Sequence, residues 1–87
     1  MQGICQETRL RIKLSVWAYA YEVQNNSLAS DAEFDFYSYM VDLKKQTSRV
    51  DMDVFFKTEF EPCTGMWIHK HPDLAGIENL YWRYYVK

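Results

Sequence analysis

The sequence predicts one all-α domain over 1–87, with an antiparallel helical hairpin and a C-terminal helix packed across it. A short helix or irregular segment is expected between them. Apolar residues recur at helical spacing over 7–24 and 31–46, and a capping signal precedes the second stretch. The single alternating stretch that could form a strand has no pairing partner. With 87 residues, 48% of them hydrophobic, the chain suffices for one core.

The first helix is predicted over 7–24, after a flexible tail at 1–6. Two apolar stripes run along it at helical spacing, which indicates a central helix that is buried on two sides. The stripes are Leu10, Leu14, Trp17 and Tyr21, and Ile12, Val16, Tyr19 and Val23. Its basic residues, Arg9, Arg11 and Lys13, are expected to spread around the solvated surface of this helix.

A polar turn separates the two helices of the hairpin, which spans 7–46. The residues at 25–27 are Asn, Asn and Ser, whose short polar side chains compete for backbone hydrogen bonds and disfavour a helix interior. Ser30 then stands three residues before Glu33, the spacing of a capping box. The second helix is therefore predicted over 31–46, antiparallel to the first because the connection is short.

The remainder divides into a connecting segment, 47–73, and a C-terminal helix, 74–87. Within the connection, 50–60 fits both alternation and helical spacing, and we favour a short helix. Gly65 suits a turn. Pro72 is expected at or near the first position of the last helix, where a missing N–H costs nothing.

Composition and charge exclude several functions. A net charge of −2 argues against binding nucleic acid by phosphate neutralisation, although Arg9, Arg11 and Lys13 offer a weak basis for it. No apolar run is long enough for a membrane span and no leader is recognisable, so we expect a cytoplasmic protein with Cys5 and Cys63 reduced. No motif indicates a catalytic centre, and we expect neither an enzyme nor a metal site.

The hairpin carries a family resemblance. Tyr19-Ala20-Tyr21, the turn, and the run SDAEFD from Ser30 to Asp35 resemble the N-terminal helical domain of NAD-dependent bacterial DNA ligases. The resemblance implies a helical site for nicotinamide mononucleotide, with Tyr21 stacking on the nicotinamide ring. The other positions it implies as ligand-binding are Glu22, Asp31, Phe34 and Asp35, of which Glu22 replaces a histidine and Phe34 a tyrosine of the family. The nucleotidyltransferase domain that a ligase needs does not fit in this chain.

Two functions follow as expectations. The first is a small non-catalytic interaction protein, resembling the short accessory proteins of phages, that modulates or inhibits a larger host protein, for example in a defence or nucleic-acid-processing complex. The aromatic content of 17% favours an exposed aromatic face, and a homodimer is the alternative use of that face. The residues expected to meet the partner are Asp31, Glu33, Asp35, Trp67, Trp82 and Tyr85. The second is a domain that binds NAD or nicotinamide mononucleotide.

Overall fold

The computed structural model describes residues 6–47, 49–62 and 64–85, and all regular elements in these ranges are helical. The prediction of an all-α fold is therefore confirmed. Two expectations, the fate of Cys5 and Cys63 and most of the tail at 1–6, lie outside the described residues. The elements in order are α1 (Gln6–Glu22), α2 (Asp31–Tyr39), α3 (Val50–Glu59), the 3-10 helix η1 (Met66–Lys70), α4 (Leu74–Leu80) and the π-helical turn η2 (Tyr81–Tyr85).

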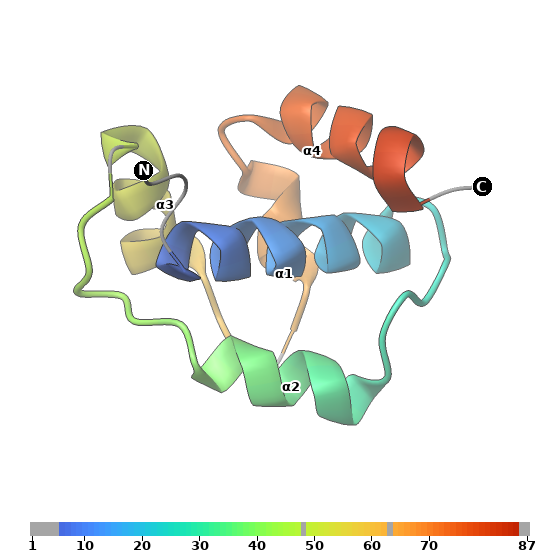
Figure 1. Ribbon diagram of the computed structural model, residues 1–87, viewed down its shortest axis with the longest axis horizontal. Coiled ribbons are helices and arrows are strands. Elements are labelled where there is room, and N and C mark those ends of the chain that lie inside the picture. Colours follow the sequence, from blue (N-terminus) through green and yellow to red (C-terminus); the bar gives the residue numbers. More distant parts are fainter. Residues whose placement is uncertain (1–5, 48, 63, 86–87) are drawn as a thin grey trace.

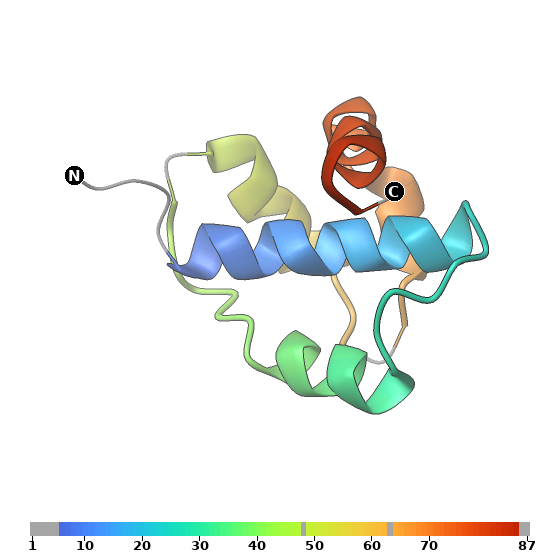
Figure 2. The same ribbon diagram turned by 45° about the vertical axis from the view of Figure 1, so that its right-hand side comes forward.

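Helix α1 is the centre of the molecule, as its two apolar stripes predict. It runs between α2 on one side and α4 on the other, with α3 beside its first half (Figures 1 and 2). Leu14, Val16 and Ala20 on α1 are fully buried, and so is Phe56 on α3. The rest of the core comes from Ala18, Tyr19, Met52, Phe55, Phe60, Trp67, Ile68, Ile77 and Tyr81. Burial of this apolar area is the main force that holds the short helices together.

The hairpin is antiparallel, since α1 and α2 run in opposite directions in both views (Figures 1 and 2). An edge-on contact between the rings of Trp17 and Tyr37, 5.7 Å between centroids, joins the two helices. The ammonium group of Lys13 lies 5.4 Å from the first ring and 4.7 Å from the second. Such cation–π contacts add a modest attraction to the apolar packing.

Helix α2 is shorter than predicted, because it ends at Tyr39 and the chain at 41–46 is not helical. The backbone beyond it bonds to side chains of α1 instead. The carbonyls of Asp42 and Lys45 accept from Arg11 Nη2 at 2.8 and 3.1 Å, and the Asp42 N–H donates to Glu7 Oε2 at 3.1 Å. A continued helix would need these backbone groups for its own hydrogen bonds.

Arg11 corrects a second expectation, because it is 2% exposed and not on a solvated surface. Its Nε donates to Glu7 Oε2 at 2.9 Å, and its Nη1 donates to Asp53 Oδ1 at 2.8 Å. Burial by itself would raise the pKa of Asp53, but hydrogen bonds from Thr47 and Arg11 outweigh it and lower this pKa below its ordinary value. Arg11 is thus a structural residue that joins α1 to α3.

The C-terminal segment differs in detail from the predicted helix at 74–87. Asp73 is the N-cap of α4 and accepts a hydrogen bond from the Gly76 N–H at 3.2 Å, so Pro72 lies in the turn before the helix. The backbone then widens into the π-helical turn Tyr81–Tyr85. The predicted helix in the connecting segment is confirmed by α3.

Candidate functional site

A cavity of about 300 Å³ opens between the end of α1, the start of α2 and the segment at 64–65. Its wall includes all five residues that the ligase resemblance implies as ligand-binding, which are Tyr21, Glu22, Asp31, Phe34 and Asp35. The other lining residues are Trp17, Ala18, Ser27, Leu28, Ala29, Thr64 and Gly65. The cavity is within the usual size range of small-molecule sites, at its lower end.

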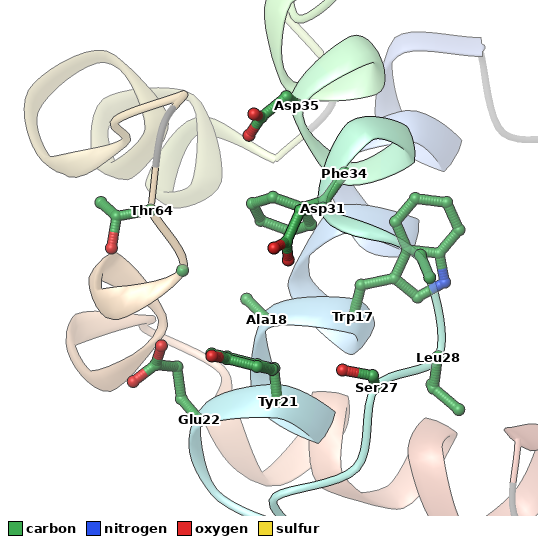
Figure 3. A pocket seen from close by; sticks show the side chains of 12 residues that line it. Trp17, Ala18, Tyr21, Glu22, Ser27, Leu28, Asp31, Phe34, Asp35 and Thr64 are labelled. Atoms are coloured by element: carbon green, nitrogen blue, oxygen red, sulfur yellow. The ribbon is translucent and has the colours of Figure 1, made fainter.

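Helical spacing explains two of the walls. Asp31, Phe34 and Asp35 lie at positions i, i+3 and i+4 of α2, so they share one face. Ala18 and Tyr21 are likewise three residues apart on α1. In Figure 3, the carboxylate of Asp31 and the ring of Tyr21 lie on opposite sides of the space above Ala18.

Two local features aim these helices at each other. Asn25 adopts a left-handed backbone, φ 53°, which Asn tolerates better than most residues. The predicted capping box is present, since Ser30 Oγ accepts from the Glu33 N–H at 3.1 Å and Glu33 Oε1 accepts from the Ser30 N–H at 3.4 Å. The box fixes where α2 begins and therefore where Asp31 stands.

The third wall comes from residues that sequence reasoning did not assign to the site. Gly65 packs so closely on α1 that an added Cβ would lie 3.3 Å from Ala18 Cβ. The indole N–H of Trp67 donates to the Thr64 carbonyl at 2.7 Å and holds this segment in place. The Gly65 turn was visible in the sequence, but its contact with α1 spans more than forty positions and had no local signal.

The cavity is electronegative. Glu22, Asp31 and Asp35 contribute carboxylates, and none of the twelve lining residues is Lys or Arg. Within the described chain, the side chains of Asp31 and Asp35 form no hydrogen bond or ion pair. His69 Nε2 lies 3.8 Å from Glu22 Oε1 at one edge. The carboxylates of α2 are therefore free to accept hydrogen bonds from a ligand.

The aromatic side chains at the cavity differ in how accessible they are. Tyr21 is 56% exposed, and its hydroxyl makes no hydrogen bond to another described residue. Phe34 and Trp17 are half-buried and pack against the core. Tyr21 is thus the ring with most surface to offer a flat ligand.

The residues expected to meet a protein partner are not gathered together at this cavity. Trp67 is a correction, because it is 4% exposed and packs against Phe55, Phe56 and Phe60 in the core. Trp82 is 50% and Tyr85 39% exposed, both on η2, and neither lines the cavity. Glu33 is exposed but is engaged in the capping box.

A second cavity, of about 230 Å³, lies between α1, α3 and α4. His71 lines it and is 7% exposed; its Nδ1 accepts from the Asp73 N–H at 3.0 Å, while its Nε2 has no partner. Burial lowers the pKa of His71 to about 4. Its wall is largely apolar, from Ile12, Met52, Ile77 and Leu80. In the described residues no three His, Cys, Asp or Glu side chains gather as metal ligands would.

Comparison of the chain with protein-family models, curated proteins and solved structures found no match. None of the helices in the described ranges has the length and hydropathy that crossing a bilayer requires.

Proposed function

We propose that the cavity between α1 and α2 binds the nicotinamide mononucleotide half of NAD, or the free mononucleotide. The observation that supports this most is the convergence of Tyr21, Glu22, Asp31, Phe34 and Asp35 on one cavity. A capped helical hairpin explains their spacing in the sequence. It does not require that a free tyrosine ring and two unpaired carboxylates face the same hollow.

Each group has a role that suits its chemistry. The exposed ring of Tyr21 stacks on the nicotinamide ring. Asp31 and Asp35 accept hydrogen bonds from ribose hydroxyls or from the carboxamide N–H groups. A volume of about 300 Å³ suits a nicotinamide ring with its ribose and leaves the adenosine half of NAD outside. We therefore expect NAD and the mononucleotide to bind with similar affinity.

An NMR titration tests this function. Nicotinamide mononucleotide is added to isotope-labelled protein, and we expect saturable amide shifts at Tyr21, Asp31 and Asp35. Tyr21→Ala should abolish them, because it removes the stacking ring. The matched control is Tyr84→Ala, which removes a tyrosine that is 65% exposed and does not line the cavity. Shifts that are absent up to millimolar ligand, or unchanged in Tyr21→Ala, would refute the proposal.

A second function is supported by a separate observation. Large apolar side chains are exposed away from the cavity, notably Phe36 (63%), Tyr39 (66%) and Met40 (54%) on α2, and Trp82 (50%) on η2. So much exposed aromatic surface on a small domain is typical of a protein-binding face. We propose that the chain acts here as a phage-encoded modulator of a larger host protein, with self-association as the competing use. Either function is proposed for the cytoplasm.

Affinity capture with purified protein distinguishes these uses. We expect wild-type protein to retain one host protein that Trp82→Ala loses, because exposed tryptophans often dominate binding energy. Tyr21→Ala is the control and should retain it. Capture by all variants alike, or by none, would contradict the interaction proposal. Light scattering on the wild type reports whether two copies occupy this face instead.

A further inference from the structure

We propose that the cavity selects its ligand by positive charge: it takes a flat aromatic cation, such as an N-substituted pyridinium, and gains nothing from a phosphate group. This inference uses the cavity of the proposed function and adds the property that the cavity recognises. It makes the phosphate-free pyridinium nucleoside as good a ligand as the mononucleotide, and the reduced, uncharged ring a poor one.

The arrangement of charge is the first support. Three of the twelve lining side chains are carboxylates, from Glu22 on α1 and from Asp31 and Asp35 on α2, and no Lys or Arg balances them. A cation placed between the two helices is attracted from both sides, at distances where partial burial limits screening by water. An uncharged ring of the same shape receives only the stacking and hydrogen-bonding part of this attraction.

The rings add to the preference. The faces of aromatic side chains attract cations. Lys13 already approaches Trp17 and Tyr37, so these two rings are partly committed within the fold. Tyr21, which is 56% exposed, and Phe34 remain at the cavity and have no such intramolecular cation. Aromatic rings interleaved with carboxylates are the usual way in which proteins hold organic cations.

A phosphate finds little support in the same place. Its negative charges would be close to three carboxylates, with no lysine or arginine among the lining residues to receive them. The start of α2 is the remaining positive feature, because helix N-termini attract anions. That end is already met by two acidic residues in the first turn, Asp31 and Glu33, and the capping box occupies the Glu33 N–H. The phosphate should therefore project into solvent.

Isothermal titration with four ligands tests the inference. They are nicotinamide riboside, a cation without phosphate; nicotinamide mononucleotide; reduced nicotinamide riboside, with a neutral ring; and 1-methylquinolinium, an aromatic cation unrelated to nicotinamide. We expect the riboside to bind at least as tightly as the mononucleotide and about tenfold more tightly than its reduced form. Asp31→Asn, which keeps size and removes charge, should reduce that tenfold preference. Glu78→Gln, an exposed carboxylate on α4 outside the cavity, should leave it unchanged.

The outcomes separate this inference from the proposed function. Equal affinity for oxidised and reduced riboside, or clearly tighter binding of the mononucleotide than of the riboside, would overturn charge selection and leave nicotinamide binding intact. Binding of 1-methylquinolinium without any nicotinamide compound would support charge selection and refute the proposed function. Failure of every cation to bind would overturn both.

Discussion

Replacement of Arg11 by methionine should remove most of the stability of this protein. The side chain is 2% exposed, and methionine fills a similar space without charge. Arg11 donates to four acceptors: the carboxylates of Glu7 at 2.9 Å and Asp53 at 2.8 Å, and the carbonyls of Asp42 at 2.8 Å and Lys45 at 3.1 Å. The substitution leaves two carboxylates facing each other in a poorly solvated space, with no cation between them.

The size of the effect follows from burial. The Glu7 and Asp53 side chains are 7% and 15% exposed, so water cannot fully replace the lost donors. Removal of one partner from a buried charge pair costs about 3–5 kcal/mol. Small domains have a free energy of unfolding of about 5–15 kcal/mol, and short chains lie toward the lower end. Arg11→Met should therefore be barely folded at 25 °C.

Urea unfolding followed by tryptophan fluorescence and circular dichroism measures this cost. The matched control is Arg9→Met, which removes an exposed arginine from the same helix and should change stability by less than about 0.5 kcal/mol. A second variant keeps the test informative if Arg11→Met does not fold: adding Glu7→Gln and Asp53→Asn removes the stranded charges and should restore part of the stability. An Arg11→Met protein within 1 kcal/mol of the wild type would refute the argument from buried charge.

Two further outcomes test the fold. Burial lowers the pKa of His71 from 6.5 to about 4, so between these values the unfolded chain binds more protons than the folded one. Stability should fall as pH decreases from 6.5 to 4, by about 2 kcal/mol after an allowance for solvent screening. His71→Phe should flatten this part of a pH series of urea midpoints, and a slope that persists in it would assign the effect elsewhere. Ser30→Ala removes one half of the capping box and should cost about 1 kcal/mol. The matched Ser27→Ala, in the exposed turn, should cost little, and equal effects would show that the cap contributes nothing.

The local features of this protein were predictable because each depends on residues that are close in the chain. The periodicity of α1 and the capping box at Ser30 depend on spacings of three and four residues. The same spacings place Asp31, Phe34 and Asp35 on one face of α2. Two walls of the candidate site could therefore be anticipated, and the resemblance of the hairpin indicated which of their side chains to examine.

Tertiary structure decided what lies against those walls. The third wall depends on the approach of Gly65 to Ala18, and the early end of α2 depends on Arg11 taking the carbonyls of Asp42 and Lys45. Trp67 looked equally suited to a surface or a core until packing placed it among the phenylalanines. Periodicity states which face of a helix is apolar but not which distant segment covers it. Contacts between positions far apart in the sequence leave no local pattern, because many pairings bury similar area.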